Sequence, residues 1–319
     1  MKLLITGAWH PTEEQLCSLR EMGHEIVFMP DERGSLPCPY EDVEGIICNG
    51  LFLYHPMERF KNLSYIQLTS AGYDRVPMDY VTEKGITIHN ARGVYSIPMA
   101  EFALSSVLSV YKQVDHFRAA QNGRRWDKHR GLRELYGKRV CIVGCGSVGT
   151  ECAKRFAAMG CEIVGVDVFP RKDESYTVML PVAALNTALM TADIVVLTLP
   201  LIPETYHLMG QEQLKLLPEG CVLVNIARGG VMDTEALIET LVARNDLTAV
   251  LDVFEEEPLP ESSPLWRMNN AVLTPHNSFV GDDNAKRLWT LIMNNLESRD
   301  YCEKSIINRN GSKPYLPIS

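Results

Sequence analysis

The strongest constraint on this chain is a glycine-rich turn near its middle. Residues 140–149 read Val-Cys-Ile-Val-Gly-Cys-Gly-Ser-Val-Gly, which predicts a β-branched strand, a G-x-G-x-x-G turn and then a helix over 150–159. A second apolar strand over 161–166 ends at Asp167, 18 residues after Gly149. Strand, turn, helix and strand in this order form one β-α-β unit of a parallel sheet.

Each glycine of this turn has its own physical role. Gly144 permits the tight turn, Gly146 lets a pyrophosphate approach the backbone, and Gly149 lets the helix pack closely on the strand. The free N–H groups at the helix start attract phosphate oxygens, and Asp167 can accept hydrogen bonds from ribose hydroxyls. The stretch therefore predicts a dinucleotide-binding unit; the alternative is a plain β-α-β unit with an exposed aspartate.

The composition narrows the class of protein. The chain has 319 residues, which is enough for about two domains. Its 46% hydrophobic and 22% charged residues are typical of a soluble globular protein, and the net charge of −9 argues against a nucleic-acid or anionic-membrane partner. Nine scattered cysteines without a C-x-x-C pair predict no metal site and suit a reducing cytoplasm. No apolar run reaches 18 residues, and the one within Met1–Gly7 is too short for a signal peptide.

Strand and helix signals alternate along the first part of the chain. Strands are expected over residues 3–6, 25–29, 45–48, 65–69 and 86–89, with a helix over 12–22 that Gly23 ends. Such alternation predicts a parallel sheet covered by helices. Between a strand and a helix lies Thr69-Ser70-Ala71-Gly72-Tyr73-Asp74, a turn of small residues whose backbone N–H groups could hold a carboxylate. An ordinary turn is an equally good interpretation of that segment.

The rest of the chain predicts a second unit of the same class. Ser96 is expected as the N-cap of a long helix over 97–121, whose first half is apolar nearly all round. Further buried strands are expected over 194–199, 221–226, 248–253 and 271–274, with Asp233 capping a helix over 234–244. A final helix over 282–301 could return to the first unit. The predicted fold is α/β, with two Rossmann/flavodoxin-like doubly wound parallel-sheet domains and a cleft between them. The substrate domain would comprise residues 1–95 plus 285–319, and the NAD-binding domain residues 96–284.

Three chemically suited side chains lie just past the ends of predicted strands, where open α/β sheets bind their ligands. Arg228 offers a planar guanidinium that can hold the carboxylate and carbonyl of a 2-oxo acid together. His276 carries an imidazole that can give a proton to a carbonyl oxygen and take it back. Glu257 could favour the protonated imidazole. Each has an ordinary alternative, namely a surface cation, a solvated acidic run and a helix-entry histidine; their order along successive strand ends favours a catalytic set.

In its motifs the sequence resembles the D-isomer-specific 2-hydroxyacid dehydrogenase family. The motifs that carry the resemblance are the glycine turn with Asp167, Leu199-Pro200-Leu201-Ile202-Pro203-Glu204-Thr205, Asn225-Ile226-Ala227-Arg228-Gly229, Asp252-Val253-Phe254-Glu255-Glu256-Glu257-Pro258, and Pro275-His276. The resemblance implies that Arg228 binds the substrate, that His276 is the acid/base and that Glu257, directly before the proline, orients and tunes it. It implies substrate contacts from Ala71, Gly72 and Tyr73. It implies cofactor contacts from Gly144, Gly146, Ser147, Val148, Gly149, Asp167, Leu199, Pro200, Thr205, Ile226, Ala227 and Asp252.

The implied activity is the NAD-dependent reduction of a small 2-oxo acid to the D-2-hydroxy acid, by a cytoplasmic homodimer. Asp167 would repel a 2′-phosphate and so favour NAD over NADP, although Arg171 could weaken that preference. The sequence departs from the family pattern in three places. Thr198 stands where a histidine is frequent, Asn277-Ser278-Phe279-Val280 follows the catalytic histidine, and Met99 replaces a valine. Phe279 could narrow the pocket for the substrate or the nicotinamide.

Other activities within the same fold remain open. A 3-phosphoglycerate dehydrogenase needs cations near the strand ends of the first domain; Arg75 and Arg92 are candidates, but the loop 49–54 is apolar and carries none. That loop favours an uncharged or hydrophobic substrate side chain. A phosphite dehydrogenase shares the Arg, Glu and His trio, whereas formate dehydrogenases have glutamine at the position of Glu257. Some family members are instead NAD-sensing modules that recruit protein partners, and the trio does not exclude that role.

Overall fold

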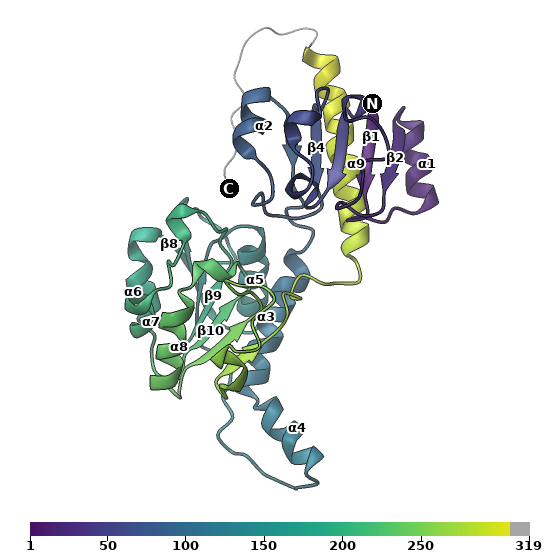
Figure 1. The fold of residues 1–319 in the computed structure, drawn as a ribbon. Coiled ribbons are helices and arrows are strands. Elements are labelled where there is room, and N and C mark those ends of the chain that lie inside the picture. Colours follow the sequence, from purple (N-terminus) through teal and green to yellow (C-terminus); the bar gives the residue numbers. More distant parts are fainter. Residues whose placement is uncertain (307–319) are drawn as a thin grey trace. The chain divides into compact units, whose positions relative to one another are not determined.

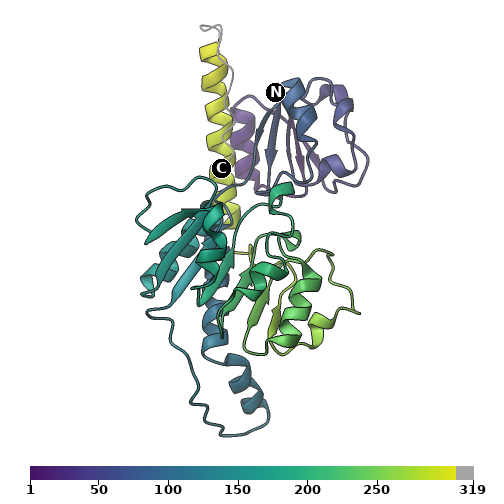
Figure 2. The same cartoon turned by 90° about the vertical axis from the view of Figure 1, so that its left-hand side faces the viewer.

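The computed structural model describes residues 1–306. The chain divides into two compact units: Met1–Tyr95 together with the chain from Asp282 onward, and Ser96–Gly281 (Figures 1 and 2). Both are built on wholly parallel sheets. Residues 307–319, which the sequence assigns to the substrate domain, lie outside the described residues.

The first unit contains a five-stranded sheet in the order β2-β1-β3-β4-β5. Its strands are β1 (Lys2–Thr6), β2 (Glu25–Met29), β3 (Gly45–Cys48), β4 (Tyr65–Leu68) and β5 (Thr87–His89), close to the five predicted stretches. Its helices are α1 (Glu13–Glu21), α2 (Met78–Lys84) and α9 (Asn284–Ile306). Because the chain goes from β1 to one side for β2 and to the other for β3, the sheet reverses its winding between β1 and β3.

Alternation along the strands divides the core of this unit into two layers. Leu4 and Ile46 pack on one face with Val81 of α2, whereas Leu3 and Ile5 pack on the other with the helices α1 and α9. α9 contributes Leu288, Ile292 and Leu296 at helical spacing. It is also tied by Asn295 Nδ2, which donates to Gln67 Oε1 at 2.7 Å. The final helix therefore completes the first sheet, beginning two residues later than predicted.

The second unit contains a seven-stranded sheet in the order β12-β11-β10-β9-β6-β7-β8. Its strands are β6 (Arg139–Val143), β7 (Glu162–Asp167), β8 (Val178–Pro181), β9 (Ile194–Leu197), β10 (Val222–Asn225), β11 (Thr248–Leu251) and β12 (Ala271–Leu273). Its helices are α3 (Ser96–Tyr111), α4 (Val114–Asn122), α5 (Ser147–Ala158), α6 (Leu185–Leu189), α7 (Gln211–Lys215) and α8 (Thr234–Ala243). Strand β8 was not predicted, because this half-exposed edge strand lacks the continuous apolar run of its neighbours.

Helices cover both faces of the larger sheet, as Figure 1 shows. Cys141 and Val143 of β6 face the layer of α6, α7 and α8, whereas Val140 and Ile142 face the layer of α3 and α5. The β-branched runs are thus buried on both sides, as parallel strands require. The predicted cap of α8 is confirmed, since the Asp233 side chain accepts from the N–H of Ala236. Helix α5 begins at Ser147, three residues earlier than predicted.

The predicted single helix over 97–121 is wrong. The chain forms α3 and α4 with a break between them, where Gln113 adopts a left-handed backbone with φ of 53°. No glycine or proline marks this break in the sequence, and residues of any type can end a helix when tertiary contacts hold them. Lys112 supplies such a contact, since its Nζ donates to the carbonyl of Arg133. Ser96 is the first residue of α3 rather than its N-cap.

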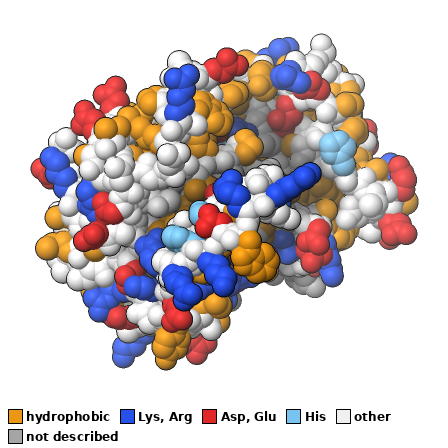
Figure 3. Space-filling view, turned by 90° about the horizontal axis from the view of Figure 1, so that it is seen from below, with side chains coloured by type: hydrophobic (Ala, Val, Ile, Leu, Met, Phe, Trp, Pro, Cys, Tyr) orange, Lys and Arg blue, Asp and Glu red, His pale blue; other side chains and the backbone are white. Residues whose placement is uncertain are grey.

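One face of the molecule carries side chains of all types. On the face shown in Figure 3, basic, acidic and hydrophobic side chains are interspersed. None of the helices in the described part of the chain is long and apolar enough to cross a membrane.

Candidate active site

The glycine turn lies where the larger sheet reverses its winding, between β6 and β9. Gly144 has φ of 92°, and a Cβ there would stand 2.7 Å from the backbone nitrogen of Leu199, which follows β9. A Cβ on Gly149 would lie 2.2 Å from the carbonyl oxygen of Gly144. Both positions therefore require glycine, one for conformation and one for helix-to-strand packing.

Gly146 differs from its two neighbours in the turn. It is the N-cap of α5, and apart from its two chain neighbours no residue has an atom within 4 Å of the place that a Cβ would occupy. The turn thus leaves open space at the start of a 12-residue helix, above the N–H groups of Ser147 and Val148. Helix N-termini with accessible N–H groups bind phosphate, so these residues fit a dinucleotide pyrophosphate.

Asp167 stands at the end of β7 beside this turn. Its carboxylate accepts from the N–H of Cys145 at 2.7 Å and from the N–H of Phe169 at 2.9 Å. These two bonds fix the carboxylate while leaving lone pairs for ribose hydroxyls. Arg171 crosses to the same turn, where its Nη2 donates to the carbonyl of Cys145 at 2.8 Å.

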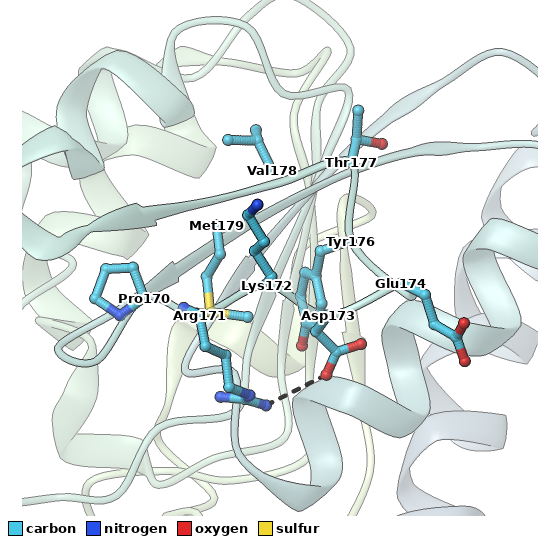
Figure 4. Close-up of a pocket in the computed structure, with 9 residues that line it drawn as sticks. All are labelled: Pro170, Arg171, Lys172, Asp173, Glu174, Tyr176, Thr177, Val178 and Met179. Atoms are coloured by element: carbon cyan, nitrogen blue, oxygen red, sulfur yellow. Dashed lines mark hydrogen bonds and ion pairs between the residues drawn. The ribbon is translucent and has the colours of Figure 1, made fainter.

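An open surface depression of about 630 Å³ lies along residues 170–179, the segment that follows Asp167 and leads into β8. Figure 4 shows the nine residues that line it, which lie between Pro170 and Met179, and the ion pair between Arg171 and Asp173. Arg228, Glu257 and His276 do not line this depression, so it is not the place of the predicted chemistry.

The loop after β9 closes against the glycine turn. Thr198 Oγ1 donates to the carbonyl of Gly144 at 2.5 Å, so this departure from the family pattern is a bond that holds the turn. Thr205 Oγ1 donates to the carbonyl of Pro200 at 2.7 Å and accepts from the N–H of Ile202. The predicted cofactor residues Leu199, Pro200 and Thr205 therefore lie in one self-bonded loop at the carboxyl edge of the sheet.

Arg228 follows β10 at the same edge. Buried Asn225 shapes its loop: Oδ1 accepts from the N–H of Ala227, and Nδ2 donates to the carbonyl of Arg228. A Cβ on Gly229 would lie 1.9 Å from the backbone of Phe254, so only glycine lets this loop press against the loop after β11. The positioning role of Asn225 was not predicted from the sequence, although this residue directly precedes Ile226 and Ala227, which were predicted to contact the cofactor.

His276 and Glu257 form a direct pair. The Nδ1 of His276 lies 2.8 Å from Oε2 of Glu257, and both side chains are a little more than one third exposed. The other carboxylate oxygen of Glu257 accepts from the N–H of Phe254 at 3.0 Å. Nε2 of His276 is thereby left for a reacting group, and the Phe279 ring stands edge-on to the imidazole with centroids 6.0 Å apart.

The acidic run before Pro258 separates into two pairs. Glu255 turns to His207 instead, whose Nε2 lies 2.5 Å from Oε1 of Glu255, and it also accepts from the N–H of Thr234. Burial opposes ionisation of Glu255, but the hydrogen bonds from Thr234 and His207 outweigh it and lower the pKa of this carboxyl. Among the three glutamates, Glu257 is thus the partner of His276.

Asp252 is fully buried beneath the histidine loop. Its carboxylate accepts from the hydroxyl of Thr274 at 2.6 Å and from the N–H groups of Asn277 and Ser278 at 2.8 and 2.9 Å. Its backbone carbonyl accepts from the N–H of His276 at 2.7 Å. His276 itself has φ of 51°, a conformation that persists only when surrounding bonds enforce it. Asp252, predicted as a cofactor contact, is therefore also the residue that orders the loop of His276.

The predicted substrate residues Ala71, Gly72 and Tyr73 follow β4 in the first unit. Ala71 is held by its carbonyl, which accepts from Asn90 Nδ2 at 2.7 Å, and Gly72 by its own carbonyl, which accepts from Ser70 Oγ. Within residues 1–306, nothing accepts a hydrogen bond from the backbone N–H of Ala71 or Gly72. These amides are available to a carboxylate.

Comparison with known proteins decides the family. Residues 104–278 match the model of the D-isomer specific 2-hydroxyacid dehydrogenase NAD binding domain. A glyoxylate reductase of Thermofilum pendens is 32% identical over 86% of this chain and 83% of its own length. The chain belongs to the D-isomer specific 2-hydroxyacid dehydrogenase family. Its second unit carries the family's NAD-binding domain, and NAD(H) is the cofactor that this domain binds.

Further members show the range of this dehydrogenase family. A D-3-phosphoglycerate dehydrogenase of Methanocaldococcus jannaschii is 31% identical over 97% of the chain, which spans only 59% of that relative's length. A family member from Xanthobacter autotrophicus Py2, solved in complex with NADPH and MES, superposes with a TM-score of 0.77 at 29% identity, covering 94% of this chain and 95% of that one. The relatives therefore differ in substrate and cofactor form, which the family alone does not assign to this chain.

Proposed function

We propose that this dehydrogenase reduces a small 2-oxo acid to the D-2-hydroxy acid with NADH, reversibly. The observation that carries the proposal is the pair of His276 and Glu257, at the carboxyl edge of the sheet whose glycine turn fits the dinucleotide. A histidine held at Nδ1 by a carboxylate is the arrangement of an acid/base residue whose other nitrogen exchanges a proton with substrate.

Each residue has a defined part in this reaction. A dinucleotide held at the glycine turn and beside Asp167 would supply the hydride to the carbonyl carbon in reduction and would accept it in oxidation. His276 donates a proton to the carbonyl oxygen from Nε2 in reduction and removes it in oxidation. Glu257 stabilises the imidazolium and fixes the ring, while Arg228 holds the carboxylate and carbonyl oxygens. The free amides of Ala71 and Gly72, with Tyr73 beside them, support the substrate carboxylate.

The deciding experiment measures NADH oxidation with glyoxylate, hydroxypyruvate, pyruvate, 2-oxoisocaproate, phenylpyruvate and 3-phosphohydroxypyruvate. The variant His276→Ala is run beside the wild type. Turnover of at least one acid, lost in the variant while NADH still binds, supports the proposal. Binding of NADH without turnover of any acid contradicts it and favours an NAD-sensing module that recruits protein partners. Oxidation of phosphite in place of these acids would mark a phosphite dehydrogenase.

We also propose a cytoplasmic homodimer. Helix α4 and the loop after it carry exposed apolar side chains, among them Phe117, Leu132 and Trp126, the last 93% exposed. Exposed apolar surface of this kind is typical of protein interfaces. Light scattering of the wild type and of Trp126→Ser tests it: a dimer weakened by the substitution supports the proposal, and a monomeric wild type contradicts it.

A further inference from the structure

The first sheet has its own ligand-binding position, at the reversal between β1 and β3. In doubly wound sheets ligands bind beyond the carboxyl ends of the strands at such a reversal, and the strand order seen here is the flavodoxin-like order, in which that position holds a phosphorylated cofactor. Any ligand that reaches this edge would meet Thr6, at the end of β1, and Asn49 and Gly50, directly after β3.

A side chain of the protein already occupies these donors. Glu32, in the loop after β2, places Oε1 2.7 Å from the hydroxyl of Thr6 and 2.7 Å from the N–H of Asn49, and places Oε2 2.7 Å from the N–H of Gly50. Its own backbone carbonyl faces Nε2 of His55 at 3.0 Å, which holds the loop in place. A carboxylate with three short donors is well anchored at this half-buried position.

The backbone amides after the next strand, β4, differ from those after β3. β4 lies beside β3, so the turn after β4 leaves the same edge of the sheet. There the amides of Ala71 and Gly72 donate to no acceptor within the described part of the chain, whereas those of Asn49 and Gly50 both donate to Glu32. One pair of amides can therefore receive an anion, and the neighbouring pair cannot.

Another hydrogen-bond acceptor, the side-chain oxygen of Asn49, lies close to Glu32. Oδ1 of Asn49 is buried and, among the described residues, has no hydrogen-bond partner. The chain then continues as the apolar segment Leu51–Leu53. Arg75 approaches this position, with its Cδ 3.6 Å from where a Cβ on Gly50 would stand. Among the described residues no ion pair joins Arg75 to Glu32, so the negative charge of the Glu32 carboxylate opposes a second anion at this position.

We propose that Glu32 is a specificity-determining residue that excludes 2-oxo acids with an anionic side chain, so that the substrate carries one carboxylate and an uncharged side chain. This inference rests on the proposed dehydrogenase function and deepens it. Like charges brought together at a site strongly disfavour the wrong ligand. The substrate carboxylate uses the free amides of Ala71 and Gly72, and a phosphate at the other end would meet Glu32.

The test compares hydroxypyruvate with 3-phosphohydroxypyruvate, which differ only by the phosphate. The wild type, Glu32→Ala and Glu32→Gln are assayed with NADH for kcat/KM on both acids. The matched control is Glu44→Gln: Glu44 also accepts a backbone N–H, that of Lys2 at 2.7 Å, but at the amino end of the same sheet. Circular dichroism and Tm report whether each variant folds. If Glu32→Ala does not fold, the comparison is made with Glu32→Gln.

The wild type is expected to favour hydroxypyruvate, and removing Glu32 to raise the relative kcat/KM for the phosphorylated acid by about tenfold or more. Glu44→Gln is expected to leave that ratio within about twofold, because its charge lies at the far edge. A wild type that prefers the phosphorylated acid, or an unchanged ratio in the Glu32 variants, would overturn the inference while the dehydrogenase function stands.

A second readout needs no turnover and so separates the two proposals. Inorganic phosphate is added to wild type and to the deciding Glu32 variant, and the rise in Tm is measured. Phosphate can also bind the glycine turn and the amides of Ala71 and Gly72 in both proteins, so a larger rise in the variant than in the wild type shows that Glu32 had closed an anion position, even if no 2-oxo acid is reduced. Equal shifts in both proteins would count against the role of Glu32.

Discussion

The imidazole of His276 and the carboxylate of Glu257 are joined at 2.8 Å through Nδ1, although 19 positions separate the two residues in the chain. Glu257 is held in turn by the N–H of Phe254, and the loop of His276 by Asp252 beneath it. The pair is thus fixed from both sides before any substrate arrives. Such preorganisation is what an acid/base residue requires, because the proton must travel along a defined direction.

Removing the imidazole tests the acid/base assignment. His276→Ala is expected to lower kcat for the best 2-oxo acid by about 100- to 10,000-fold, the usual contribution of a general acid. NADH affinity, measured by fluorescence, is expected to stay close to wild type, since the glycine turn lies on other strands. A variant that keeps its rate would assign the proton transfer to another group.

The two glutamate–histidine pairs provide a matched comparison. Glu257→Gln keeps the shape of the side chain but removes the charge that stabilises the imidazolium, so kcat/KM for reduction is expected to fall by about tenfold or more. Glu255→Gln alters the neighbouring pair with His207 and is expected to leave kcat/KM within about threefold. Steady-state kinetics of both variants decides the assignment, and a larger loss in Glu255→Gln would reverse it.

Substitutions at two glycines of the turn are expected to affect cofactor binding and stability separately. Gly146→Ala places a methyl group in the open space over α5, so the protein is expected to keep its Tm but to lose about tenfold or more in NADH affinity, or about 1.4 kcal/mol. Gly149→Ala drives a methyl group against the carbonyl of Gly144 and is expected to cost about 1–3 kcal/mol of stability. Thermal melts and NADH titrations of both variants check this; equal NADH affinity in Gly146→Ala would argue against a pyrophosphate there.

Asp252 is expected to matter for both stability and activity. In Asp252→Asn one acceptor oxygen becomes a donor that faces the N–H of Asn277 or Ser278, which costs about 1–3 kcal/mol for each group left unpaired. Because the loop of His276 is then less constrained, kcat is expected to fall as well. Chemical denaturation and kinetics on the same samples measure the two effects, and an unchanged free energy of unfolding would show that the buried carboxylate is not needed.

Asp167 determines the expected preference for the cofactor. Its carboxylate would repel a 2′-phosphate, so the wild type is expected to use NADH with a higher kcat/KM than NADPH. Asp167→Asn keeps an acceptor for the N–H of Cys145 but removes the charge, and should narrow the preference by about tenfold. A wild type that favours NADPH by about tenfold would contradict this, and Arg171 would then be the first residue to substitute.

The lowered pKa of Glu255 predicts a pH-dependent contribution to stability. Because its pKa is lower in the folded chain than in the unfolded one, near 4.3, the ionised form stabilises the fold above that pH. The contribution is lost as the pH falls through the folded-state pKa. The Glu255 side chain is 29% exposed, and the solvent that reaches it weakens its interactions, so the effect is about 1 kcal/mol or less. The Tm deficit of Glu255→Gln relative to wild type is therefore expected at pH 7 and should shrink near pH 3.5; a constant deficit would contradict the assignment.

Local patterns in the sequence determined most of the elements. Apolar runs located the five strands of the first sheet and six of the seven strands of the second, because parallel strands buried on both faces are recognisable without knowledge of their neighbours. The glycine spacing likewise located the turn at Gly144 and Gly149, where a Cβ would collide with backbone. Edge strand β8 and the break at Gln113 were not predicted from the sequence. An exposed edge strand has a weak apolar signal, and no glycine or proline marks the break.

The sequence by itself determined which chemical groups stand at the strand ends, since the order of strands, turns and motifs is written along the chain. Only the tertiary structure decided their partners. It joins Glu257 to His276 and Glu255 to His207, buries Asp252 beneath the histidine loop, and directs Glu32 onto amides that a ligand could otherwise use. The physical reason is that hydrogen bonds depend on distances of about 3 Å between atoms far apart in sequence, which packing alone sets.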